Sequence, residues 1–271
     1  MAVSIEPQRK MLEELGGGNF EVFTVMPAGA NPETYDPPMS ARARMAQAKA
    51  YFTTGHLAFE DAVAGSTPTI DTSVGIMPVI GTHGHGAREE AEDGHHHKAE
   101  GHHHEAEHLH HDHGEADPHV WTSVRNAKAM AYAMLAQLVA ADAANADSYR
   151  ANFAKMIARY DSLDAAISHS LEGARHSFAV WHPSLSYFAR DYGLKQISVG
   201  QESKEMPAGR LKEIIDIARA DSVEVFFFQK EYDSRQAESL NREIGSRLVN
   251  INPLAYEWEE ELMRVADELS K

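Results

Sequence analysis

The chain contains no cysteine among its 271 residues. It therefore has no disulfide, no thiolate metal site and no cysteine nucleophile. It also lacks any apolar run approaching the roughly 20 residues that a membrane-spanning helix needs. The opening MAVSIEPQRKMLEELGGG reads as a strand followed by a helix, not as a signal peptide. We expect a domain that starts so abruptly to be the mature form of an exported protein, with its export signal removed.

Positive charge is scarce as well. Lys and Arg number 25 against 41 Asp and Glu, which gives a formal net charge of −16 with neutral histidine. Such a surface repels nucleic acid and anionic membranes, so we exclude both as partners. The excess of negative charge favours a cationic ligand.

Common catalytic motifs are missing from the predicted helices and strands too. No predicted helix carries an HExxH motif, and the chain has no GxSxG elbow and no glycine-rich phosphate loop. The glycines of GTHGHG at 81–86 lie at the edge of a histidine-rich run, so they do not form a dinucleotide-binding motif. We therefore predict a binding protein and not an enzyme.

What the chain has in abundance is histidine. Twelve of its 17 histidines lie between Thr82 and Ala116, among many carboxylates. Imidazole nitrogen suits zinc, copper and nickel. Because this stretch has almost no apolar residues, we expect a disordered, metal-binding insertion over about 83–116. An expression tag would lie at a terminus, and an acidic linker would not carry so many histidines by chance.

Short apolar strands alternate with helical stretches on both sides of one long helix, predicted from about Asn145 to Leu171. At 1.5 Å per residue, about 25 residues make a helix about 40 Å long, which suits a connector between two lobes. The pattern predicts an α/β fold with two lobes of parallel-rich sheet. We place the first lobe at 1–144, the connecting helix at 145–172 and the second lobe at 173–271.

Histidines outside the insertion suggest a second metal site. Ligands bind at the carboxyl ends of strands in open α/β sheets. His56 follows the predicted strand YFTTG, His182 follows SFAVW, and His119 lies in DPHVW, where the insertion ends. A lone histidine after a strand is usually an ordinary loop residue, but the three together predict a zinc site in the cleft, with a carboxylate or water as fourth ligand. We assign His169 to the surface and His176 to a structural role.

Segments along almost the whole chain carry a family resemblance. They are VSIEPQRKMLEELGG, GANPETYDPP, AYFTTG, DPHVWTSVRNAKAMA, DSYRANFAKMIARYDSLDAAI, WHPSLSYFARDYGL, FFFQKEYDSRQAESLNREIG and NINPLAYEW. In this order they resemble the zinc/manganese-type substrate-binding proteins of bacterial ABC importers, the ZnuA-like cluster A-I. The resemblance implies two lobes joined by a rigid long helix, with a metal held between them by His119 and His182.

The sequence departs from the family pattern at two places. The family loop often reads HxY with histidine as a ligand, and Glu33 stands there in this chain. Either Glu33 or His56, or both, would supply this ligand, and we favour His56. Many members have an acidic ligand before the final ProLeu, where this chain has Asn252. A neutral amide there, together with His182, favours zinc over manganese. Glu231 is a further acidic candidate.

The resemblance implies a function. An extracytoplasmic or periplasmic monomer would capture Zn²⁺ tightly in the cleft and deliver it to the membrane permease of an ABC importer. The histidine-rich insertion would collect metal weakly at many sites. Zinc affinity should fall as the pH drops through the histidine range near about 6.5. A histidine-rich storage or buffering protein without a permease, and a manganese-selective member, are the alternatives.

Overall fold

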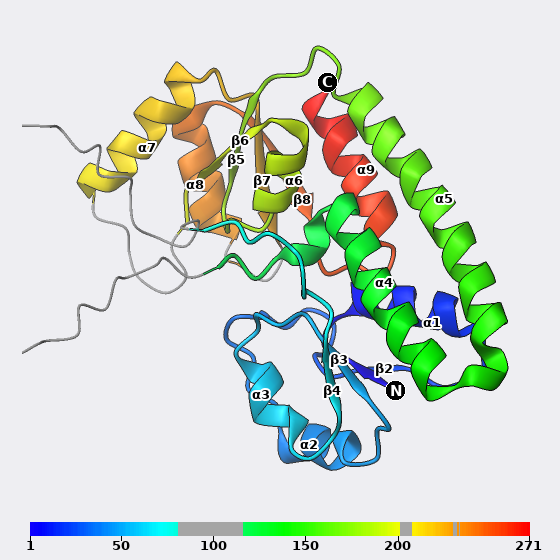
Figure 1. The fold of residues 1–271 in the computed structure, drawn as a ribbon. Helices are drawn as coiled ribbons and strands as arrows, with labels where there is room; N and C mark the ends of the chain where they lie inside the picture. The colour runs from blue at the N-terminus through cyan, green and yellow to red at the C-terminus, as the bar shows by residue number, and fades with distance from the viewer. Residues whose placement is uncertain (81–115, 201–207, 230–231, 233) are drawn as a thin grey trace, which may run out of the picture.

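The computed structural model describes residues 1–80, 116–200, 208–229, 232 and 234–271. The histidine-rich insertion lies outside these residues except for Ala116, and so does Glu231. Within the described part there are two four-stranded parallel sheets, one above the other, and a long helix runs past both along one side of the molecule (Figure 1). The predicted α/β class and the two parallel sheets are therefore confirmed.

The first sheet has the strand order β2-β1-β3-β4, and every pair of neighbours is parallel. Its strands are very short, and helices connect them. The elements are β1 (Ala2–Val3), α1 (Glu6–Gly16), β2 (Phe23–Thr24), α2 (Met39–Met45), β3 (Tyr51–Thr53), α3 (Phe59–Ala64) and β4 (Thr69–Asp71). We call this sheet with α1–α3 the first lobe.

The second sheet repeats the same parallel order, β6-β5-β7-β8. Its elements are β5 (Ser177–Val180), α6 (Ser186–Tyr192), β6 (Lys195–Ser198), α7 (Ala208–Ala220), β7 (Val225–Gln229), α8 (Ser234–Ile244), β8 (Arg247–Ile251) and α9 (Trp258–Leu269). We call this sheet with α6–α8 the second lobe. The numerical lobe boundaries given above stay a prediction.

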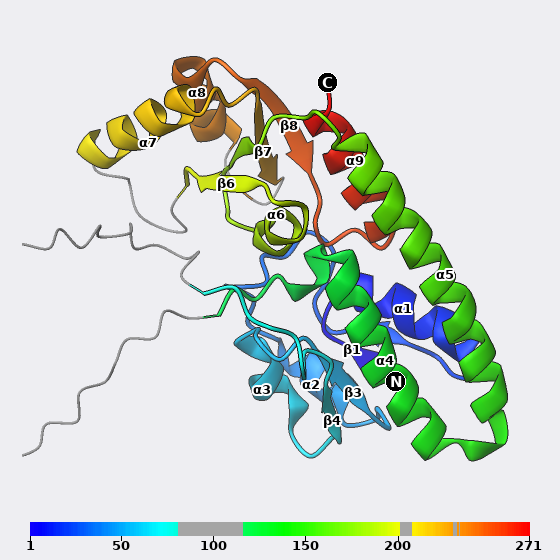
Figure 2. The same cartoon turned by 45° about the horizontal axis from the view of Figure 1, so that its top comes forward.

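A helical hairpin joins the lobes. It consists of a short 3-10 turn η1 (Val120–Thr122), α4 (Val124–Ala141), a second turn η2 (Ala143–Asn145) and α5 (Ala146–Ser170). Helix α5 runs along one side of the molecule, packed on α1, α4 and α9 (Figure 2). Asn145 precedes α5 as predicted, but it does not cap the helix; its side chain donates to Asp142 instead, at 2.8 Å. No helix in the described ranges is long and apolar enough to cross a membrane.

The hydrophobic core is shared between the lobes. One buried cluster runs from the first sheet through α4 and α5 to Phe178, Phe227 and α9. A second cluster contains Ala179 and Phe226 and packs against α7 and α8. Successive residues of a strand point to opposite faces, so one face of the second sheet is packed on the rest of the molecule and the other on its own helices.

The two ends of the histidine-rich insertion are held together. Ile80 and Ala116 form an antiparallel bridge, and the amide of Asp117 donates to the carbonyl of Val79 at 2.8 Å. The hydroxyl of Tyr187 on α6 donates to the carbonyl of Asp117 at 2.8 Å and accepts from the amide of Val79 at 3.3 Å. We call these residues, 79–80 and 116–117, the stem. It rests on the second lobe.

Candidate metal centre

His119 lies two residues beyond the stem, and a buried carboxylate orients its ring. The Oδ1 atom of Asp117, a side chain with no exposed surface, accepts from the His119 amide at 2.8 Å and lies 2.9 Å from Nδ1 of the ring. An ionised carboxylate can only accept, so Nδ1 carries the proton. The lone pair of the neutral imidazole is then on Nε2, which is the arrangement of a metal-ligating histidine with a carboxylate behind it.

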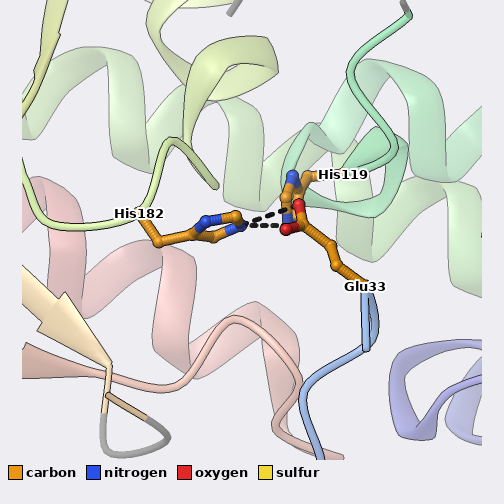
Figure 3. Close-up of side chains that lie close together, drawn as sticks. All are labelled: Glu33, His119 and His182. Carbon is orange, nitrogen blue, oxygen red and sulfur yellow. Dashed lines mark hydrogen bonds and ion pairs between the residues drawn. The ribbon is translucent and has the colours of Figure 1, made fainter. Parts of the chain in front are cut away.

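His182 follows β5 and comes from the other side of the cleft. Its side chain is buried, and its ring stacks on Tyr232 with centroids 5.2 Å apart and planes at 21°. Its Nε2 atom lies 3.2 Å from Nε2 of His119 and 3.2 Å from Oε1 of Glu33, as Figure 3 shows. Two imidazole nitrogens thus converge from different parts of the chain.

Glu33 completes the group. It lies in the loop between β2 and α2, where its amide donates to Oδ1 of Asn31 at 2.9 Å, and its side chain is 14% exposed. Ligand atoms of Glu33, His119 and His182 all lie within 4.8 Å of one another. Two imidazole nitrogens and one carboxylate oxygen are a donor set that zinc takes in open sites, where a fourth position is left for water.

His56 does not join this group. Its side chain is exposed, and the structure brings Glu33 together with the two histidines, not the His56 that we favoured. The reason is the turn after β3. The buried carboxylate of Glu60 accepts from the amides of Thr54, Gly55 and Leu57 at 2.7, 3.0 and 3.3 Å. This turn leaves the intervening histidine side chain in solvent.

The other described residues singled out in the sequence are exposed. Asn252 is exposed, and its Oδ1 accepts from the amide of Leu254 at 3.2 Å, so it serves the turn before α9. The His169 side chain is 84% exposed, which confirms its assignment to the surface. His176 is also exposed and directly precedes β5.

A small cavity of about 20 Å³ lies beside the group, which is room for about one water molecule. The residues that line it are Asn31, Pro32, His119, Trp121, His182, Ser184, Gln229, Tyr232, Pro253 and Leu254. Trp121 closes part of it, because its indole N–H donates to the carbonyl of Pro253 at 2.8 Å.

Gln229 is a buried polar residue that the sequence did not single out, although it ends β7 and so satisfies the strand-end rule. Its Nε2 donates to Oγ of Ser184 at 2.6 Å and to the carbonyl of His182 at 3.4 Å. A carbonyl can only accept, which fixes the orientation of the amide. Its Oε1 is buried and has no hydrogen-bond partner in the described part of the chain. It is therefore an acceptor available to a water molecule in the cavity.

Comparison with known proteins places the chain in a family. The sequence matches the ZnuA family, described as zinc-uptake complex component A, periplasmic, over residues 1–266. The chain belongs to this family. Among curated members, it is 28% identical over 267 residues to the zinc-binding lipoprotein AdcA of Streptococcus pneumoniae, covering 94% of this chain and 50% of AdcA. The chain therefore spans about half the length of that relative.

Solved structures agree with the ZnuA family fold. A zinc-bound ZnuA deletion mutant superimposes with a TM-score of 0.82 at 30% identity, covering 99% of this chain and 95% of the other. FpvC of Pseudomonas aeruginosa in complex with Mn²⁺ gives a TM-score of 0.79 at 22% identity, covering 99% and 96%. The second likeness is one of fold alone. The predicted family is confirmed.

Proposed function

We propose that this chain is the extracytoplasmic zinc-binding component of an ABC importer, which captures Zn²⁺ between its two lobes and delivers it to a membrane permease. The observation that carries the proposal is the convergence of Glu33, His119 and His182, with ligand atoms within 4.8 Å of one another. Zinc is the cargo of this site. Membership of the ZnuA family and the likeness to a zinc-bound ZnuA support the same conclusion.

The donor set supports zinc over manganese. Imidazole nitrogen is a borderline-soft ligand that suits zinc, whereas Mn²⁺ prefers carboxylate, carbonyl and water oxygens. The group offers two nitrogens and one carboxylate, and the exposed amide of Asn252 adds no further charge. With three protein ligands, the fourth tetrahedral position would fall to a water molecule, for which Oε1 of Gln229 is an acceptor.

Capture depends on the protonation of the ligands. The proton of His119 is held on Nδ1 by Asp117, so its lone pair is on Nε2, and Nε2 of His182 lies 3.2 Å from that atom. Zinc would bind both nitrogens. Ligands must be deprotonated to bind metal, so affinity should fall as the pH drops through the histidine range near about 6.5.

The remaining parts of the proposal concern partners and place. The chain works outside the cytoplasm as a monomer, with a permease as its macromolecular partner. The histidine-rich insertion raises the local concentration of metal near the cleft through many weak sites. Co-purification of the chain with a cognate permease, and the sedimentation behaviour of the isolated chain, test these two partner statements.

The experiment that tests the central claim removes residues 83–115. This joins Ile80 to Ala116 through Gly81 and Thr82, a two-residue connection with glycine first, which suits an antiparallel pair. Zinc is titrated calorimetrically into the metal-free shortened chain and into the same chain with His182→Ala, Glu33→Ala or His56→Ala. His176→Ala is the matched control for His182→Ala, because His176 is an exposed histidine next to the same strand, β5.

One tight site should survive the deletion. Because loss of a supporting residue already weakens a metal site about 10–100-fold, loss of the ligand in His182→Ala or Glu33→Ala should weaken it further. His56→Ala and His176→Ala should leave it unchanged. If all zinc binding disappeared with the insertion, the cleft site would be refuted and the chain would be a histidine-rich metal buffer.

A further inference from the structure

A continuous chain of contacts links the candidate ligands across the cleft through two residues that are not ligands. Nδ2 of Asn31, in the first lobe, donates to the hydroxyl of Tyr232, in the second, at 3.2 Å. Asn31 also accepts from the amide of Glu33 at 2.9 Å. Tyr232 in turn stacks on the ring of His182. The order is Glu33, Asn31, Tyr232, His182.

The contacts in this series determine how each side chain is oriented. The amide of Glu33 can only donate, so the Asn31 oxygen faces it and the Asn31 nitrogen faces Tyr232. The Tyr232 ring lies at 21° to the His182 ring, with centroids 5.2 Å apart, so it covers one face of the imidazole. Both Asn31 and Tyr232 line the cavity beside the candidate metal centre.

We propose that Asn31 and Tyr232 form a latch across the cleft, which positions Glu33 and His182 and sets the rate at which zinc leaves. The inference rests on the proposed function, because it concerns the same site. Neither residue belongs to the group of candidate ligands. They act through the loop that carries Glu33 and through the ring of His182.

The physical reason is that release needs the two ligands to separate. Glu33 and His182 belong to different lobes, and the hydrogen bond between Asn31 and Tyr232 must break when they move apart. The net contribution of one hydrogen bond corresponds to a factor of about 3–10 in a rate when it is lost before the transition state. The stack adds to this by limiting rotation of the His182 ring.

The test measures zinc release from the chain lacking residues 83–115, by stopped-flow transfer to a chromophoric chelator in excess. Tyr232→Phe removes the hydroxyl and keeps the stack. Tyr232→Ala removes both, and Asn31→Ala removes the donor to Tyr232 together with the acceptor of the Glu33 amide. Tyr132→Phe is the control, because Tyr132 is 65% exposed on α4 and loses the same hydroxyl far from the chain of contacts.

Tyr232→Phe should release zinc about 3–10-fold faster than the unsubstituted chain, Tyr232→Ala faster still, and Tyr132→Phe at the unsubstituted rate. Tyr232→Phe combined with Asn31→Ala should release zinc no faster than Asn31→Ala alone, because the bond that Tyr232→Phe breaks is already lost in Asn31→Ala. Equal release rates for Tyr232→Phe and Tyr132→Phe, with a tight site present in both, would overturn the latch and leave the proposed function standing. Absence of a tight site in the unsubstituted shortened chain would overturn both.

Discussion

Arg159 connects three helices, and its removal gives a quantitative test of how the long helix is held. From α5, its Nε and Nη2 atoms donate to the two carboxylate oxygens of Glu259 on α9 at 2.7 and 3.0 Å. Its Nη2 also bonds Glu14 on α1. The carboxylates raise the pKa of the guanidinium further, led by the hydrogen bond to Glu259. Arg159→Ala removes the whole arrangement without altering the helix-forming tendency of α5.

The magnitude follows from exposure. The Glu259 side chain is only 10% exposed, so its two-pronged, charge-assisted contact should contribute about 1.5–3 kcal/mol. The side chain of Glu14 is 31% exposed, so its contact with Arg159 adds only roughly a few tenths of a kcal/mol. Lys10, 3.9 Å from Glu259, remains as a counter-charge in the variant. Arg159→Ala should therefore lower the free energy of unfolding by about 2 kcal/mol.

Urea unfolding of the metal-free chain measures this, with Arg150→Ala as the matched control on the same helix. Arg150 is 57% exposed and pairs with a fully exposed Asp147, so its loss should change the free energy of unfolding by less than about 0.5 kcal/mol. Combining Arg159→Ala with Glu259→Gln should lower the free energy of unfolding by less than the sum of the two single effects. Equal effects of Arg159→Ala and Arg150→Ala would refute the reasoning.

Three further predictions concern the site and the first lobe. Asp117→Asn should weaken zinc binding about 10–100-fold, because an amide no longer enforces the proton on Nδ1 of His119; unchanged affinity in calorimetry would contradict this. Burial raises the pKa of Glu60, so its contribution to stability is complete below about pH 4.5 and is lost as the pH rises through the raised value. Glu60→Gln cannot ionise and should destabilise the chain more at pH 4.5 than at pH 7 in urea; the reverse order would count against the raised pKa. Gly55→Ala should lower the free energy of unfolding by about 1–3 kcal/mol, because φ is +81° and the new Cβ would meet Asp71. If the variant unfolded at the same temperature as the unsubstituted chain, this position would not be strained.

Most of the scaffold could be predicted because its signals are local. The long helix expected from about Asn145 to Leu171 is α5 (Ala146–Ser170). Apolar periodicity and turn residues determine such elements within a few residues of sequence. Strand ends were less accurate: the strand predicted at YFTTG is β3 (Tyr51–Thr53), since pairing with a neighbour decides where a short strand ends.

The site was harder to predict, because strand position alone does not say which way a turn carries the next side chain. His56 follows β3 as expected, yet Glu60 determines the turn and leaves the imidazole exposed. The contact of Asn31 with Tyr232 joins residues 201 positions apart in the chain, which no local pattern reveals. Asp117 was within reach of the sequence, because it stands two residues before a predicted ligand and carboxylates commonly hold ligating histidines.

The stem affects how the length of the insertion can change in evolution. Ile80 and Ala116 are paired, and Tyr187 anchors both strands of the stem to α6, so the two positions that flank the insertion lie next to each other. Doubling the length of a loop closed in this way costs only about 0.6 kcal/mol in entropy. The number of histidines carried there can therefore grow or shrink while Glu33, His119 and His182 keep their geometry. Under the proposed function, the amount of metal that the insertion holds and the affinity of the cleft site would be separately adjustable.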